Sequence, residues 1–100
     1  MKYQVLLTDE ATKDFNALEK IERKKILKAF DIIENVDIAA VNTRPLTDKL
    51  LEIKADNVRA LYVYSKNKLI IVGLIFIKKT QKTPSKYIVK AERILQEYIK

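Results

Sequence analysis

The stretch that most constrains the fold is residues 69–84, where nine residues, eight of them large and apolar, lead directly into a polar segment. Nine residues suit a strand and are too few to cross a bilayer. A strand without polar alternation is buried on both faces, so we expect residues 69–77 at the centre of a sheet and not at its edge. Residues 78–84 then hold three lysines, two threonines and a glutamine. A buried strand that ends in cations and hydrogen-bond donors is suited to presenting a site for a phosphate-bearing ligand.

The composition narrows the possible chemistry. One hundred residues, 48% of them hydrophobic, predict a single domain over residues 1–100 with one core. Cysteine is absent, which excludes a disulfide framework and a thiolate metal site and makes a reducing cytoplasm the expected location. Histidine is absent too, so we expect no metal and no cofactor, and any catalysis must use Lys, Arg, Tyr, Asp or Glu. The apolar run at the amino terminus is too short for a signal peptide, and no segment has the length of a membrane span.

The charge of the chain is unevenly distributed. The net charge is +7, yet residues 1–50 hold nine Lys/Arg against nine Asp/Glu, whereas residues 51–100 hold eleven against four. This asymmetry suggests a face that binds a polyanion. A lysine-rich, solvated surface explains the charge alone equally well.

The first half of the chain reads as a strand followed by helices. Residues 3–7 are a strand candidate, and Thr8 can cap the helix that follows. Apolar residues recur at helical spacing up to Val36, with a break in phase that predicts a helix hairpin bending at residues 22–24; a single long helix is the alternative. Residues 37–48 read as a connection into the sheet.

The second half reads as a strand meander and a final helix. Strands are predicted at residues 50–54, 58–64 and 69–77, and the short turns between them require antiparallel neighbours. Gly73 marks either a bulge or the close approach of a helix. Thr83 and Pro84 are expected as the cap and first-turn proline of a helix running to the end of the chain. The predicted fold is therefore an α+β domain, a small, mostly antiparallel sheet with an amino-terminal helix hairpin and a carboxy-terminal helix.

Three segments carry a resemblance to a known family: Leu-Glu-Ile-Lys at 51–54, Val-Arg-Ala-Leu-Tyr at 58–62, and Phe-Ile-Lys-Lys-Thr-Gln-Lys-Thr-Pro at 76–84. With the element order, they resemble the RelE/ParE superfamily of bacterial toxins, in its HigB-like, phage-derived branch. The resemblance implies a RelE-like fold and an mRNA interferase, a ribosome-dependent endoribonuclease that inhibits translation. It also implies a cognate antitoxin, usually a helix-turn-helix DNA-binding protein. Lys54 stands where this branch often has arginine, which keeps the charge but loses the fork geometry.

The candidate catalytic residues are Arg59, Lys54, Lys79 and Tyr87. Metal-free RNA cleavage needs stabilisation of extra negative charge on phosphate, and Arg59, which the resemblance also places in the site, can supply it. We expect Arg59 to be exposed on a sheet face that the helices leave open; a merely solvated arginine is the alternative. A lysine crowded by other cations loses its proton more easily, which makes Lys54 and Lys79 candidates for proton transfer. The Tyr87 hydroxyl is a candidate general acid or substrate-orienting group. The alternative is that Tyr87 is an ordinary packing residue.

The candidate RNA-binding residues are Arg44, Lys78, Thr80, Gln81 and Lys82. The lysines suit phosphate contacts, but such a run is also typical of a solvated strand exit. Thr80 and Gln81 either bind phosphate or cap the helix. Arg44 either reaches a ligand or anchors the connection in which it lies.

Two other functions remain open from the sequence. A ParE-like inhibitor of DNA gyrase shares the superfamily fold and acts by binding a protein, but it would not need the lysine cluster. A non-catalytic nucleic-acid-binding module would be expected to show several stacking aromatics beside the charges, whereas Phe76 and Tyr87 are the aromatics near them.

Overall fold

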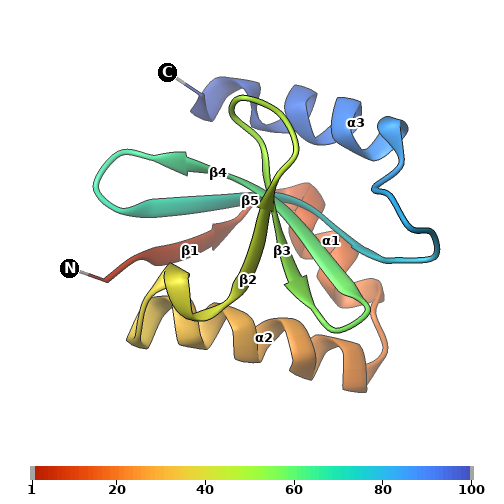
Figure 1. Ribbon diagram of the computed structural model, residues 1–100, viewed down its shortest axis with the longest axis horizontal. Helices are drawn as coiled ribbons and strands as arrows, with labels where there is room; N and C mark the ends of the chain where they lie inside the picture. The colour runs from red at the N-terminus through yellow and green to blue at the C-terminus, as the bar shows by residue number, and fades with distance from the viewer. Residues whose placement is uncertain (1, 100) are drawn as a thin grey trace.

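The structure, a computed structural model, describes residues 2–99 and has the predicted α+β architecture (Figure 1). Strands and helices follow the expected order, with one additional strand and two short 3₁₀ helices. The elements are β1 (Gln4–Leu7), α1 (Asp9–Ala17), α2 (Lys20–Asn35), η1 (Ile38–Ala40), β2 (Asn42–Pro45), β3 (Leu51–Ala55), β4 (Val58–Ser65), β5 (Leu69–Ile77), α3 (Ser85–Leu95) and η2 (Gln96–Tyr98). Within residues 2–99, no helix combines the length and apolar character that a membrane span requires.

The five strands form one sheet in the order β1-β5-β4-β3-β2. The meander from β3 to β5 is antiparallel, as predicted, and β1 joins the sheet by pairing with β5 in parallel. β5 is interior, as its apolar sequence requires, although β4 and not β5 is the middle strand. β2 was expected as part of a connection; it pairs antiparallel with β3 and forms the edge of the sheet.

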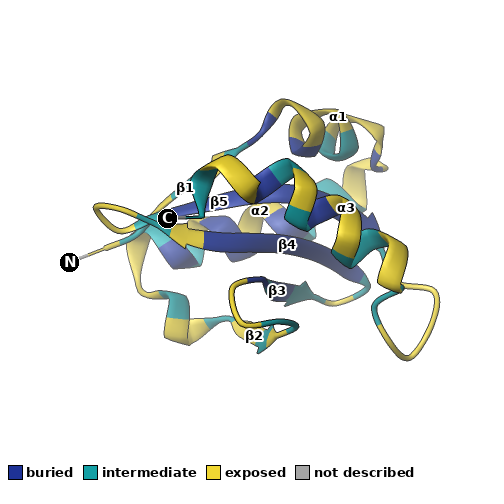
Figure 2. Ribbon diagram, turned by 90° about the horizontal axis from the view of Figure 1, so that it is seen from above, coloured by how far each residue is buried: buried dark blue, intermediate teal, exposed yellow. Residues whose placement is uncertain are grey.

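Helices cover both faces of the sheet, which corrects the expectation that one face stays open. One core packs α1 and α2 against the sheet, and a second core packs α3 against the opposite face. Figure 1 shows α3 on one side of the sheet and α2 on the other, and in Figure 2 β4 and β5 are largely coloured as buried. Alternate residues of these two strands therefore enter different cores, which explains why β5 has apolar residues on both faces.

The helix hairpin exists, but its bend lies at residues 18–19 and not at 22–24. Thr8 caps α1 as predicted, accepting a hydrogen bond from the Ala11 N–H at 3.1 Å. Glu19 and Glu22 form a capping box that starts α2, in which the Glu19 N–H donates to Glu22 Oε1 at 3.0 Å. Glu22 thus belongs to the first turn of α2, which is why the phase break alone misplaced the bend.

Both readings of Gly73 are correct. The β4–β5 register shifts between Leu61, which pairs with Leu74, and Tyr62, which pairs with Val72, so Gly73 is the extra residue of a bulge. A Cβ on Gly73 would lie 2.6 Å from Cγ of Leu95, the last residue of α3. The missing side chain therefore lets α3 pack closely on the sheet.

The start and end of α3 differ from the prediction. Pro84 occupies the N-cap position rather than the first turn, and the hydroxyl of Thr83 donates to Glu52 instead of capping the helix. Ala91 and Leu95 are buried, and α3 ends at Leu95 and the chain continues as η2, whereas the sequence predicted one helix running to the end of the chain.

Candidate basic site at the carboxyl end of β5

Three candidate side chains lie in one row across the sheet. Lys54 on β3 is directly opposite Arg59 on β4, and Arg59 is directly opposite Phe76 on β5. Residues paired in this way share a face and have Cβ atoms about 4.5–5.5 Å apart. Phe76 belongs to the core beneath α3, so the row lies on the α3 face. Lys54, near the sheet edge, also borders a groove of about 280 Å³ beside α2.

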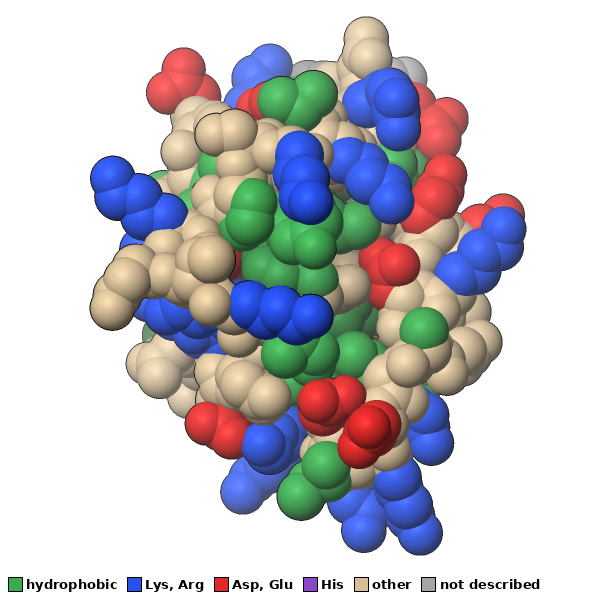
Figure 3. All heavy atoms as spheres, turned by 90° about the vertical axis from the view of Figure 1, so that its right-hand side faces the viewer, with side chains coloured by type: hydrophobic (Ala, Val, Ile, Leu, Met, Phe, Trp, Pro, Cys, Tyr) green, Lys and Arg blue, Asp and Glu red, His purple; other side chains and the backbone are tan. Residues whose placement is uncertain are grey.

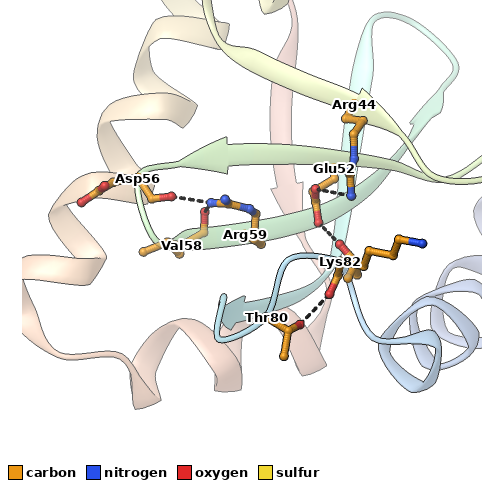
Figure 4. A network of polar contacts seen from close by, with 8 residues as sticks. Arg44, Glu52, Asp56, Val58, Arg59, Thr80 and Lys82 are labelled. Atoms are coloured by element: carbon orange, nitrogen blue, oxygen red, sulfur yellow. Dashed lines mark hydrogen bonds and ion pairs between the residues drawn. The ribbon is translucent and has the colours of Figure 1, made fainter.

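Arg59 is buried rather than exposed, with only 7% of its surface accessible, and it lies on the sheet face against which α3 packs. Its Nη1 donates to the Asp56 carbonyl and, at 3.1 Å, to the Val58 carbonyl (Figure 4). The β3–β4 turn thus holds one end of the guanidinium, and within residues 2–99 no hydrogen bond is formed by its other N–H groups. A cation fixed in this way needs little reorganisation to stabilise a developing charge.

The turn that holds Arg59 is itself fastened to α2. Lys25 Nζ lies 2.6 Å from Asp56 Oδ2 and donates to Asn57 Oδ1 at 3.2 Å. The hydrogen bond and charge of Lys25 lower the pKa of Asp56 below its usual value. Asp56 also has a left-handed backbone with φ of 58°, a conformation that aspartate tolerates better than most residues.

Tyr87, two residues into α3, packs beside this row. Its ring centroid is 4.5 Å from that of Phe76, with the planes tilted by 39°. The ring is half-buried, as the packing alternative expected, and it lines a hollow of about 190 Å³ together with Lys78 and Lys79. Tyr87 therefore packs against the core and also lies close to two lysines of the candidate site.

We call residues 78–84 the basic loop. Its candidate residues Lys78, Lys79, Thr80, Gln81 and Lys82 are all exposed. The Thr80 hydroxyl donates to the Lys82 carbonyl at 2.6 Å and does not cap α3, whereas phosphate binding by Thr80 stays a prediction. Among residues 2–99, no acidic side chain forms an ion pair with a lysine of this loop. Figure 3, which views this end of the molecule, shows Lys and Arg side chains around a hydrophobic centre, with some acidic side chains between them.

Arg44 lies on β2 and not in a loop. Its Nη2 is 3.6 Å from Oε1 of Glu52 on the neighbouring strand. This contact agrees with the anchoring role; an RNA contact by Arg44 stays a prediction.

Glu52, in the Leu-Glu-Ile-Lys segment, has a structural role that was not predicted from the sequence. Glu52 is only 1% exposed and contacts both Arg44 and Thr83. Glu52 is a charged residue between the apolar Leu51 and Ile53 on a strand. The same pattern marks Arg59, so the sequence contains a signal that predicts a role for Glu52. Within residues 2–99, no group of His, Cys, Asp or Glu side chains is arranged to hold a metal ion.

Comparisons with known proteins agree with this architecture. The profile of the family described as phage-derived protein Gp49-like (DUF891) matches residues 13–96. No curated protein matches the sequence.

Several solved RelE structures share the fold. The archaeal RelE–RelB complex of Pyrococcus horikoshii has 21% identity and a TM-score of 0.60, over 77% of this chain and 96% of that chain. The toxin-antitoxin complex RelBE2 of Mycobacterium tuberculosis has 15% identity and a TM-score of 0.66, over 78% and 100%. The isolated E. coli RelE toxin has 17% identity and a TM-score of 0.60, over 88% and 97%. At such identities the likeness is one of fold.

The sheet order and the three helices within residues 2–99 thus define a RelE-like α+β fold. Within that class, the chain belongs to the Gp49-like family of phage-derived proteins, since the family profile covers most of its length. Both findings confirm the fold and phage-derived branch that the sequence resemblance implied.

Proposed function

We propose that this protein is the toxin of a toxin-antitoxin system and cleaves messenger RNA on the ribosome without a metal ion. The observation that carries the proposal is the row of Lys54, Arg59 and Phe76, with Tyr87 packed beside it and the exposed basic loop at its end. Family membership and the RelE fold support the toxin assignment. The gyrase-inhibitor alternative gains no support from the matched structures, which are RelE proteins.

In this proposal the candidate residues have different roles in catalysis and RNA binding. Arg59, buried and held by two carbonyls, stabilises the charge that develops on the scissile phosphate. Lys54 and Lys79 are the candidates for proton transfer, and Tyr87 orients the substrate or donates a proton. Lys78, Lys82, Thr80 and Gln81 hold the RNA backbone.

The proposal includes a partner and a location. The matched RelE–RelB and RelBE2 structures are complexes of toxin with antitoxin, which supports a cognate antitoxin here. We propose a helix-turn-helix DNA-binding protein for that role. Action on ribosomes implies the cytoplasm.

The test compares cleavage of messenger RNA on programmed ribosomes with cleavage of naked messenger, with the cuts mapped. The wild type should cut only on ribosomes. Arg59→Ala should cleave at least about 100-fold more slowly with ribosome binding nearly unchanged, because an interaction made mainly in the transition state appears in turnover. Arg59→Lys keeps the charge but loses the fork, so it should recover only part of the rate.

The matched control is Arg93→Ala, which removes an exposed arginine from the last turn of α3. It should cleave like the wild type, and thermal melting of all three variants separates loss of fold from loss of chemistry. Wild-type cleavage by Arg59→Ala would place the catalytic centre elsewhere. Intact RNA together with inhibited gyrase would support the alternative function.

A further inference from the structure

Glu52 is the most completely buried charged side chain within residues 2–99, with 1% of its surface exposed. A buried carboxylate is strongly destabilising unless it is paired and hydrogen-bonded. Both of its oxygens have partners: Oε1 is 3.6 Å from Arg44 Nη2, and Oε2 accepts a hydrogen bond from the Thr83 hydroxyl (Figure 4). One carboxylate therefore joins β2, β3 and the basic loop.

The basic loop is otherwise attached weakly. At its start, the Lys78 N–H donates to the Asn57 carbonyl at 2.8 Å. The hydrogen bond of Thr80 stays inside the loop, at the Lys82 carbonyl. Within residues 2–99, the bond from Thr83 to Glu52 is the side-chain hydrogen bond that ties the carboxyl end of the loop to the sheet.

The exposed lysines of the loop repel one another, and within residues 2–99 no acidic side chain pairs with them. Ordering a loop residue requires roughly 1–2 kcal/mol of backbone entropy, so a loop with few contacts depends on each of them. The attachment point is also close to the candidate site, because Glu52 precedes Lys54 by two residues on the same face of β3.

We propose that Glu52 is a positioning residue that, through Thr83, holds the basic loop in place beside the Lys54–Arg59 row. Glu52 itself is too deeply buried to contact substrate. The anchoring of the loop follows from the contacts above; its consequence for RNA rests on the function proposed in the preceding section.

The experiment uses the full chain and measures tryptic cleavage after Lys78, Lys79 and Lys82 in the folded protein. Thr83→Val keeps the shape of the side chain but removes the donor, so cleavage within the loop should become at least about tenfold faster. Thr83→Ser restores a hydroxyl and should return the rate toward that of the wild type. Thr12→Val, which removes from α1 a hydroxyl that donates to the Thr8 carbonyl, is the control and should leave loop cleavage unchanged.

A second measurement uses messenger RNA on programmed ribosomes. Thr83→Val should raise KM for the ribosome-bound messenger several-fold more than it lowers kcat, and Thr83→Ser should recover both. Glu52→Gln keeps an acceptor for Thr83 but loses the charge that pairs with Arg44; it should protect the loop better than Thr83→Val does.

The outcomes separate the two proposals. Equal tryptic cleavage of wild type and Thr83→Val would overturn the anchoring role, whatever the RNA result. A wild-type protein that leaves RNA intact while its loop protection still depends on Thr83 would overturn the proposed nuclease and support the anchor.

Discussion

The close packing of α3 on Gly73 makes a quantitative prediction about Gly73→Ala. The added Cβ would lie 2.6, 2.9 and 3.0 Å from three side-chain atoms of Leu95. Separations this short require movement, and Leu95 is fully buried, so its side chain has no free space to turn into. The substitution must therefore push α3 away from the sheet or distort the bulge.

The expected change follows from two opposing effects. Overpacking of a core destabilises by about 1–3 kcal/mol. Gly73 has no positive φ, so alanine is compatible with its backbone, and the reduced entropy of the unfolded chain offsets about 0.4–1 kcal/mol. We expect the free energy of unfolding to fall by about 0–2.6 kcal/mol, which lowers the melting temperature by up to roughly 20 °C in a domain of this size.

The assay is thermal and urea unfolding of Gly73→Ala, alone and combined with Leu95→Ala. Leu95→Ala alone should cost about 2–5 kcal/mol and leaves a cavity above Gly73. In that background, Gly73→Ala should become neutral or stabilising, because its methyl group fills the space. If Gly73→Ala raises the melting temperature of the otherwise unchanged protein, α3 does not pack on Gly73 as described.

Two further predictions concern charge. Burial raises the pKa of Asp14, whose carboxylate accepts a hydrogen bond from the Ile75 N–H at 3.1 Å. The folded protein therefore binds the proton of this carboxyl group more tightly than the unfolded chain does, and the stability falls as the pH rises from about 4. Asp14→Asn keeps an acceptor without the charge, and its stability relative to the wild type, measured by urea unfolding, should increase between about pH 4 and 7; a constant difference would refute this. Reversing the charge of Lys79 and Lys82 should weaken ribosome binding and reduce the slope of log affinity against log salt by about 0.7 for each phosphate that the protein no longer neutralises. The control Lys66→Glu, at the opposite end of the β4–β5 hairpin, should change neither the affinity nor the slope. Salt-independent binding would exclude a phosphate role for this face.

The sequence alone determined the interior strand, the meander, the helix hairpin and the exposed lysines after Ile77. These features follow from local signals: a nine-residue apolar run, short turns, helical spacing and a cluster of cations. The family resemblance likewise depends on contiguous segments. Such signals report how each residue relates to its chain neighbours, which is why they needed no tertiary information.

Only the tertiary structure decided which distant residues and segments contact one another across the sheet. β2 has four residues, a proline and little burial, so its strand conformation comes from pairing with β3 and not from its own sequence. Arg59 is buried on the sheet face against which α3, supplied by a later part of the chain, packs. Glu52 meets Thr83 from 31 residues away, and no local pattern encodes that contact, because it depends on where two distant segments come to rest in the folded chain.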